Sequence, residues 1–300
     1  MTVQNTQKQA LVALKQYGKT FNFAKLFLEK ETGDDAAVLY RFCRIVDDIV
    51  DEKSCEKEAG LQLENIIKAI KMRDIHHEIA GPFLQLCSKH KIDPVYGLQL
   101  IKGVSKDLNS VAIESQDELI EYSYYVAGTV GLMMAPILRS QSDGYLFAID
   151  LGIAMQLTNI ARDVQEDAQT SRCYLPKPWI QNADCKDVFS THPKTRKTFQ
   201  NAISKTLGLA ELYYNSGLKG LHFLPSKNRR AIGIAACLYR QIGRKLMNNN
   251  CEYWNGRTVV SPFEKTKLAC LYLYNEITQE APSEPSAHDA RLHTALKSII

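Results

Sequence analysis

Two pairs of aspartates with the same spacing constrain this chain more than any other feature. Asp47 and Asp51 form the first pair, and Asp163 and Asp167 form the second. Because residues four apart lie above one another on a helix, each pair places two carboxylates on one helix face. Like charges at that range repel unless a cation lies between them. Two such helices facing each other would form an all-oxygen site suited to Mg²⁺ and to the phosphates that it binds.

The residues around each pair predict helices that are apolar apart from one polar stripe. At about 100° per residue, Tyr40 and Arg44 share the face of the first pair, and Gln156 and Asn159 share that of the second. A guanidinium can hold a phosphate group through two hydrogen bonds, and Arg162 lies beside the second stripe. One pair alone is typical of a solvated helix face. Two pairs on apolar helices predict a wet cavity inside a helical protein, because unpaired buried charge is costly.

The remaining composition predicts a single all-α domain over residues 1–300. Hydrophobic residues make up 45% of the 300, which supports a large core, and strand signals and flexible linkers are scarce. We expect residues 281–300 to form a loose tail with a short terminal helix. Helix breaks are expected at Gly33-Asp34, Gly81-Pro82, Asp93-Pro94, Ser142–Gly144, Pro176–Pro193 and Pro225-Ser226.

Charge and cysteine usage exclude several classes of protein. A net charge of +4 does not indicate nucleic-acid binding, but it is compatible with anionic substrates or an anionic membrane surface. The polar segment Met1–Lys8 predicts no secretory signal. The eight cysteines lack zinc-ligand spacing, so we expect free thiols without zinc or disulfides. We interpret His76-His77-Glu78 and His288-Asp289 as incidental rather than as metal or phosphohydrolase motifs.

Two longer motifs carry a family resemblance. The first is Tyr-Ser-Tyr-Tyr-Val-Ala-Gly-Thr-Val-Gly-Leu-Met-Met, beginning at Tyr122. The second contains Gln156-x-x-Asn159-Ile-x-Arg162-Asp163 and is followed by Arg172-x-Tyr-x-Pro. At these residues the chain resembles the squalene/phytoene synthase family of head-to-head prenyl transferases, and bacterial phytoene synthases most. The resemblance runs from about residue 20 to about residue 265, nearly the whole chain.

The resemblance implies a fold and a set of site residues. It implies an isoprenoid-synthase bundle around a central cavity, with about three Mg²⁺ ions at the aspartates. The implied catalytic residues are Asp47, Asp51, Asp163, Asp167 and Tyr122, and Asn159 joins the aspartates as a metal ligand. The implied substrate-binding residues are Phe21, Tyr40, Arg44, Gly128, Gly131, Gln156, Asn159, Arg162, Arg172, Tyr239 and Arg257. The glycines would leave a groove for a prenyl tail, and close helix packing is the alternative explanation.

The resemblance also implies a reaction in two ionisations. Two geranylgeranyl diphosphates would condense to a cyclopropylcarbinyl diphosphate and then rearrange to phytoene, a step in carotenoid biosynthesis that needs no NADPH. The enzymatic alternative is a squalene, dehydrosqualene or hydroxysqualene synthase that uses farnesyl diphosphate. The alternative from another class is a non-catalytic isoprenoid-binding protein. The segment from Arg172 to Pro193 is expected to be a flap over the diphosphates or a plain loop. We expect a cytoplasmic protein with peripheral contact to the inner membrane face.

Overall fold

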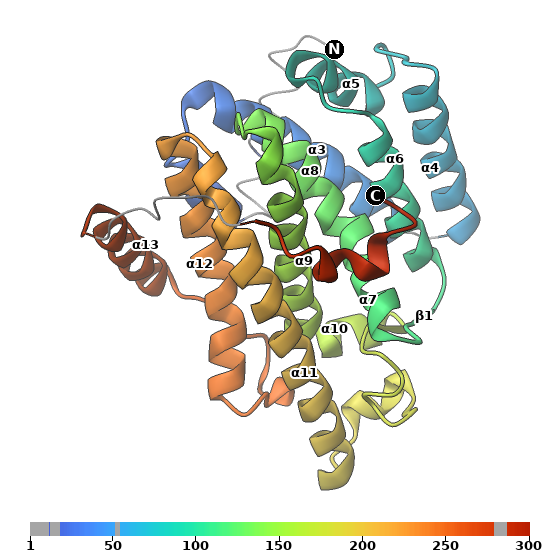
Figure 1. Ribbon diagram of the computed structural model, residues 1–300. Helices are drawn as coiled ribbons and strands as arrows, with labels where there is room; N and C mark the ends of the chain where they lie inside the picture. Colours follow the sequence, from blue (N-terminus) through green and yellow to red (C-terminus); the bar gives the residue numbers. More distant parts are fainter. Residues whose placement is uncertain (1–11, 13–18, 52–54, 279–286) are drawn as a thin grey trace.

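The computed structural model describes residue 12 and residues 19–51, 55–278 and 287–300 (Figure 1). The segments Met1–Lys8 and 281–286 therefore lie outside the described residues. The described chain is all-α, as the sequence predicted, apart from one pair of two-residue parallel strands. The longer helices are α2 (Lys19–Lys25), α3 (Lys30–Asp51), α4 (Glu56–Lys71), α5 (Ala80–His90), α6 (Val95–Ser105), α7 (Gln116–Ser123), α8 (Thr129–Ile137), α9 (Tyr145–Arg162), α10 (Val164–Gln169), α11 (Pro193–Gly217), α12 (Ser226–Asn248) and α13 (Pro262–Thr278).

Short elements join the helices. A π-helical turn, η2 (Tyr124–Gly128), joins α7 to α8, and strands β1 (Val111–Ala112) and β2 (Arg172–Cys173) pair in parallel. The 3₁₀ turns are η1 (Lys106–Leu108), η3 (Ser142–Gly144), η4 (Cys185–Phe189), η5 (Leu218–Phe223), η6 (Tyr253–Asn255) and η7 (Ala290–Leu296).

Helix α9 lies at the centre of the molecule, between α8, α11 and α12 (Figure 1). It belongs to a segment, Ser142–Arg162, that is long and apolar enough to cross a membrane by length and composition. The other helices bury 61% of that segment's apolar stretch. Its hydrophobicity is therefore explained by its place in the core, since a helix that is apolar on most faces must be covered on most faces.

Two hydrophobic clusters flank the region where the aspartates meet. The larger one surrounds α9 and α11, with Leu157 and Phe199 fully buried. The second is formed by α3 to α6, where Phe42 and Phe83 stack with ring centroids 4.0 Å apart. Helix α3 and helix α9 thus belong to different halves of the core, and their polar faces can be directed toward the space between them.

The helix break predicted at Gly33-Asp34 is wrong. Both residues lie inside α3, which begins at Lys30, and Gly33 is buried beneath the side chain of Lys25. A Cβ atom at Gly33 would lie 2.8 Å from Cε of Lys25, and the Lys25 ammonium pairs with Asp34 at 3.1 Å. Tertiary contact with α2 therefore favours glycine here and outweighs its weak helix propensity.

The C-terminal residues are not a loose tail where they are described. Turn η7 packs against α7, and His293 and Leu296 are buried. The hydroxyl of Tyr213 on α11 also donates a 2.7 Å hydrogen bond to the carbonyl of Leu292. A short terminal helix was expected in this region, and turn η7 lies there. Its docking on α7 and α11 was not expected, because local composition does not reveal a docking site on distant helices.

Candidate active site

The four aspartates of the two pairs converge on one polar chamber of about 340 Å³. Helix α3 supplies the first pair near its C-terminal end, and the junction of α9 and α10 supplies the second. The chamber is lined by Arg44, Asp47, Val50, Asp51, Val104, Asp107, Tyr122, Val126, Gln156, Asn159, Ile160, Arg162, Asp163, Asp167, Arg172, Tyr174 and Arg257. Most of these residues were predicted, and the structure gathers them from six separate segments.

The first pair has the helix geometry that its spacing predicts. Asp47 lies inside α3, and Asp51 is the last residue of that helix. Tyr40, Arg44 and Asp47 all border the same continuous space, in keeping with a shared face. The guanidinium of Arg44 forms an ion pair with Asp48, which is not one of the paired aspartates.

The second pair does not lie on one uninterrupted helix. Helix α9 ends at Arg162, and Asp163 leaves helical geometry with φ −102° and ψ 16° before α10 begins. The backbone N–H of Asp167 nevertheless donates a 2.9 Å hydrogen bond to the carbonyl of Asp163. The i,i+4 relationship therefore survives the break, and both carboxylates border the chamber.

One carboxylate of each pair is held in an environment that favours protonation. Burial, followed by the charge of Asp51, raises the pKa of Asp47 to about 7. Burial and the charge of Asp163 likewise raise the pKa of Asp167 to about 8. A cation between the carboxylates would remove this penalty.

The donor set of the chamber fits a hard divalent cation. Carboxylate and amide oxygens are the ligands that Mg²⁺ accepts, and Asn159 adds an amide beside the second pair. Among the described residues, Oδ1 of Asn159 is buried and accepts no hydrogen bond. Such an acceptor is costly unless a ligand satisfies it, so its position is consistent with the predicted role in metal binding.

Three arginines contact the paired carboxylates. Arg162 donates a 2.6 Å hydrogen bond from Nε to Asp163, and Arg257 donates two of 3.0 Å to the same carboxylate. Arg172 donates to Asp51 at 2.7 Å, and strand β2 holds its backbone beside β1. These three predicted residues therefore lie where a bound diphosphate could replace a carboxylate as their partner.

Asp107 is a chamber residue that the sequence analysis missed. It is buried, which raises the pKa of its carboxyl, and it accepts a 2.8 Å hydrogen bond from the hydroxyl of Tyr122. The Tyr122 ring stacks on Tyr174, with centroids 4.7 Å apart. No second acidic residue at helical spacing marks Asp107, so only the fold reveals it.

An apolar cavity of about 360 Å³ continues from the chamber along α9. Asp47, Gln156 and Asn159 border both spaces, so the polar and apolar spaces are contiguous. Positions from Asn159 back to Phe147 line one side, which corresponds to roughly 18 Å along the helix axis. The cavity is lined by Phe21, Tyr40, Cys43, Arg44, Asp47, Val126, Ala127, Val130, Gly131, Met134, Ala135, Leu138, Ser140, Gly144, Phe147, Ala148, Leu151, Gly152, Met155, Gln156, Asn159, Gly217, Gly220, Leu221, Leu224, Ile232, Ala235 and Tyr239.

Three predicted aromatic residues form the cavity wall near the chamber. The ring of Phe21 lies 5.4 Å from that of Tyr239 and 6.3 Å from that of Tyr40, measured between centroids. They come from α2, α12 and α3, so the structure brings together residues far apart in the chain. Aromatic faces attract cations, which suits a site where positive charge develops on carbon.

The two predicted glycines serve the contact between helices. A Cβ atom at Gly131 would lie 2.2 Å from the carbonyl oxygen of Ala148 on α9, and one at Gly128 would lie 3.3 Å from Cγ2 of Ile149 on the same helix. Gly131 also borders the cavity, whereas Gly128 is not among its lining residues. Close packing between helices therefore accounts for both glycines, and the groove explanation stays a prediction for Gly131 alone.

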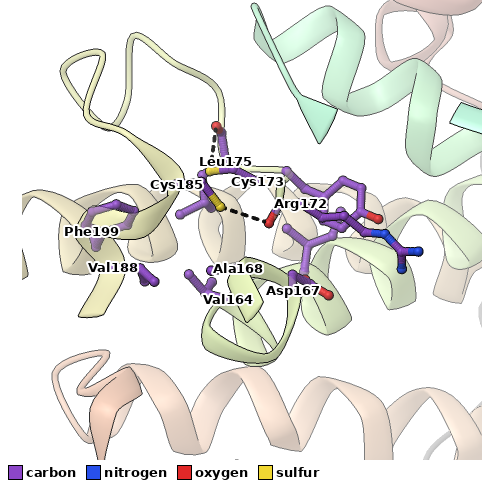
Figure 2. A pocket seen from close by; sticks show the side chains of 11 residues that line it. Val164, Asp167, Ala168, Arg172, Cys173, Leu175, Cys185, Val188 and Phe199 are labelled. Carbon is purple, nitrogen blue, oxygen red and sulfur yellow. Dashed lines mark hydrogen bonds between the residues drawn. The ribbon is translucent and has the colours of Figure 1, made fainter. Parts of the chain in front are cut away.

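The segment after the second pair packs beside the chamber. A small pocket there is lined by Asp167, Arg172 and residues up to Val188 and Phe199 (Figure 2). The thiol of Cys185 donates a 3.4 Å hydrogen bond to the carbonyl of Arg172, so turn η4 holds the backbone of that arginine. Burial raises the pKa of both Cys173 and Cys185, which makes reactive thiolates unfavourable.

Comparisons with known proteins agree with this geometry. The model of the family described as squalene/phytoene synthase matches residues 14–264. A 15-cis-phytoene synthase of Enterobacter agglomerans is 33% identical over 83% of this chain and 89% of its own, and one of Pantoea ananas is 30% identical over 89% and 91%. A crystal structure of a ligand-bound dehydrosqualene synthase superposes with a TM-score of 0.81 at 25% identity, covering 92% of this chain and 98% of that one.

Proposed function

Because the chain belongs to the squalene/phytoene synthase family, we propose that it condenses two prenyl diphosphates head to head, with geranylgeranyl diphosphate as substrate and phytoene as product. The bacterial relatives named as 15-cis-phytoene synthases support this substrate and a role in carotenoid biosynthesis. The similarity extends over most of both chains, so it applies to the whole catalytic domain.

One observation carries the proposal. The polar chamber holds both aspartate pairs, and it opens directly into an apolar cavity that follows α9. A prenyl diphosphate has the same division, with a charged head and a long hydrocarbon tail. Burial of the tail contributes roughly 0.8 kcal/mol per CH₂, so the cavity can provide affinity while the chamber fixes the head group.

The chain's own residues have distinct tasks in this reaction. Arg172 and Arg257, now paired with aspartates, would bind diphosphate oxygens and stabilise the charge of the leaving group. The rings of Phe21, Tyr40 and Tyr239 would stabilise the allylic cation that remains. The double bond of the second prenyl diphosphate molecule attacks this cation, and proton loss gives the cyclopropylcarbinyl diphosphate. The apolar wall keeps water away from the cations.

We propose that Asp47, Asp51, Asn159, Asp163 and Asp167 hold about three Mg²⁺ ions, which supply Lewis-acid activation of the diphosphates. The raised pKa values of Asp47 and Asp167 support this assignment, since cation binding relieves the repulsion that raises them. We propose that Tyr122, which lines the chamber and donates a hydrogen bond to the buried Asp107, takes part in proton transfer there.

The proposal is tested by product analysis with each prenyl diphosphate. Purified protein is incubated with geranylgeranyl or farnesyl diphosphate and Mg²⁺, with and without NADPH, and the products are identified by chromatography and mass spectrometry. We expect phytoene from the C20 substrate without NADPH. Exclusive use of the C15 substrate would favour the squalene, dehydrosqualene or hydroxysqualene alternative, for which the structural similarity to a dehydrosqualene synthase is the supporting observation.

Aspartate variants separate an enzyme from a non-catalytic isoprenoid-binding protein. We expect Asp47→Ala and Asp163→Ala each to abolish Mg²⁺-dependent diphosphate release while the helical circular dichroism signal persists. The exposed Asp143 lies outside both cavities, so Asp143→Asn serves as the control. Diphosphate release that is absent from the parent would favour the binding protein. Release unaffected by both variants would instead show that these aspartates are not the metal ligands.

We further propose that the protein is cytoplasmic and contacts the membrane peripherally, because its product is lipophilic and must be released. Helix α13 supports this proposal, because Phe263 and Tyr274 are 80% and 64% exposed on one face, with exposed Lys267 between them. Co-sedimentation with anionic phospholipid vesicles should fall in a Phe263→Ser/Tyr274→Ser variant. The control Leu212→Ser alters an exposed leucine on α11 and should bind vesicles as the parent does.

A further inference from the structure

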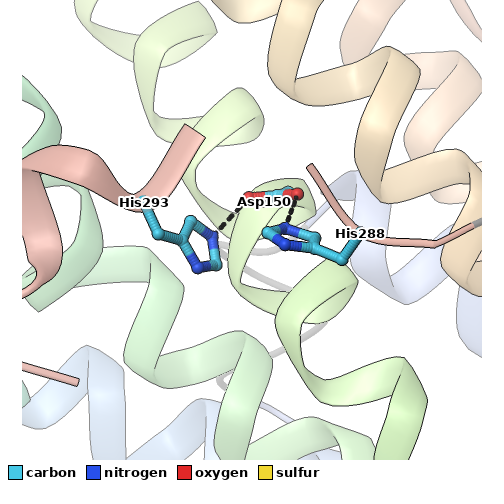
Figure 3. A group of neighbouring side chains, drawn as sticks. All are labelled: Asp150, His288 and His293. Atoms are coloured by element: carbon cyan, nitrogen blue, oxygen red, sulfur yellow. Dashed lines mark hydrogen bonds and ion pairs between the residues drawn. The ribbon is translucent and has the colours of Figure 1, made fainter. Parts of the chain in front are cut away.

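Asp150, His288 and His293 form a buried cluster outside the active site (Figure 3). Asp150 lies near the start of α9 and its side chain is fully buried. The two histidines come from the C-terminal segment, and their side chains are only 8% and 7% exposed. From its place in the tail, His288-Asp289 was interpreted as incidental. Spacing along the chain does not reveal the cluster, because Asp150 lies 138 positions before His288.

Both imidazoles direct the same nitrogen at the carboxylate. Nε2 of His288 lies 2.9 Å from Oδ2 of Asp150, and Nε2 of His293 lies 2.7 Å from Oδ1. The three candidate ligand atoms all lie within 4.8 Å of one another. Neighbouring ligands of a tetrahedral zinc ion lie about 3.4 Å apart for bonds of about 2.1 Å, so small ring movements would accommodate an ion.

The charge of the cluster calls for a cation. A buried carboxylate is unfavourable unless positive charge compensates it, and two neutral imidazoles would leave the charge of Asp150 unbalanced. The ligand atoms gathered here include two imidazole nitrogens, which transition metals prefer.

We propose that Asp150, His288 and His293 bind a divalent transition metal ion of the zinc type, which fastens the C-terminal segment to α9. Each imidazole would present the lone pair of Nε2 to the ion and carry its proton on Nδ1. The hydroxyl of Ser216, which contacts the same carboxylate, or a water molecule would complete four-coordinate geometry. A closed site of this kind would be structural rather than catalytic.

This site is independent of the proposed reaction. The match to the family model ends at residue 264, so both histidines lie beyond it. The cluster also shares no lining residue with either the polar chamber or the apolar cavity. Its ligands contain nitrogen, whereas the active-site ligands are oxygen atoms, so zinc and magnesium should distribute differently between the two sites.

The experiment uses the full chain after treatment with a chelator and dialysis. Zn²⁺ binding is measured by titration calorimetry, and Co²⁺ is added separately to observe the absorption of a four-coordinate ion. We expect one Zn²⁺ per chain at this site and a higher melting temperature with Zn²⁺. His288→Ala and His293→Gln should each weaken this binding by at least about 100-fold, since loss of a direct ligand should exceed the effect of losing an outer partner.

Two control variants identify the site. His76→Ala removes an exposed histidine on a distant loop and should bind Zn²⁺ like the parent. Asp47→Ala alters the active-site pair and should also keep this binding, which separates the result from any failure of the proposed reaction. Circular dichroism and the melting temperature without metal show whether each variant is folded.

Several outcomes would overturn the proposal. The proposal fails if the parent protein binds no Zn²⁺, or if the binding is lost in Asp47→Ala and retained in both histidine variants. Equal stabilisation of the parent and of His288→Ala by Zn²⁺ would also count against it. Any of these results would leave the cluster as a hydrogen-bonded contact between the C-terminal segment and α9.

Discussion

The guanidinium of Arg172 donates a 2.7 Å hydrogen bond to the carboxylate of Asp51, which lies 121 residues earlier in the chain. Arg257 similarly donates two hydrogen bonds to Asp163. One aspartate of each pair thus has an arginine partner from a distant segment. The other members, Asp47 and Asp167, are the two whose pKa values are raised.

The first prediction concerns Arg172. The two terminal NH₂ groups of its guanidinium donate hydrogen bonds of 2.7 Å to Asp51 and 3.2 Å to the carbonyl of Asp107. The single ammonium group of a lysine would not reproduce both bonds. Because a hydrogen bond to a charged group contributes about 1.5–3 kcal/mol, we expect Arg172→Lys to lower kcat/KM by about 10- to 100-fold. Arg230→Lys is the matched control, since Arg230 forms an exposed ion pair with Glu276. Equal kinetics for the two variants would contradict the assignment.

The second prediction concerns pH and metal. Because the pKa values of Asp47 and Asp167 are raised from 3.8 to about 7 and 8, the folded protein binds more protons than the unfolded chain between about pH 4 and 8. Without metal, the free energy of unfolding should therefore fall as pH rises through this window. Mg²⁺ should reverse the loss at the upper end.

Melting temperatures measured from pH 5 to 9, in chelator and in excess Mg²⁺, check this prediction. In Asp47→Asn the decline with pH should be smaller, because one titrating group is removed. The idea fails if the metal-free protein becomes more stable between pH 6 and 8.

The third prediction concerns Gly131. An added methyl group would meet the carbonyl oxygen of Ala148, so α8 and α9 would have to separate. Overpacking of this kind costs about 1–3 kcal/mol, and we expect Gly131→Ala to lower the melting temperature and to reduce activity on C15 and C20 substrates alike.

Gly208 provides the control for Gly131. It lies within α11, and a Cβ atom there would meet nothing within 4 Å. Gly208→Ala should stabilise the protein by about 0.5–1 kcal/mol. A selective loss on the C20 substrate in Gly131→Ala, without a lower melting temperature, would restore the groove explanation.

The fourth prediction concerns the depth of the apolar cavity. Leu221 in η5 lines the cavity near the N-terminal end of α9. This end of the cavity is the one farther from Asn159 and the polar chamber. A larger ring there should shorten the space for the tail, so Leu221→Trp should lower kcat/KM for geranylgeranyl diphosphate more than for farnesyl diphosphate. Leu212→Trp, at an exposed position of α11, should change neither value. Equal losses on both substrates would place the end of the tail elsewhere.

Local spacing accounts for the parts of the site that were predicted. Tyr40, Arg44, Asp47 and Asp51 follow from the period of one helix, α3. The last three line the polar chamber, and Tyr40 lines the adjoining cavity. Even where the second helix breaks at Asp163, the hydrogen bond from Asp167 preserves the i,i+4 relationship. Which side chains share a helix face depends on hydrogen bonds within about one helical turn, and the periodicity of the sequence predicts this well.

Contacts between distant segments account for what was missed. Asp107 lines the chamber and bonds Tyr122, which comes from α7, and Gly33 remains helical because α2 covers it. The role of Gly131 depended on how closely α8 approaches α9. None of these distances is encoded by the spacing of neighbouring residues.

The sequence by itself determined the helical class, the two carboxylate pairs and the side chains that share their faces. Only the tertiary structure decided which arginine meets which aspartate, where the apolar cavity continues, and that His288 and His293 reach Asp150. The physical reason is the range of the interactions. Helix periodicity acts over four residues, whereas these partners are between 94 and 143 residues apart and meet only when the whole core packs.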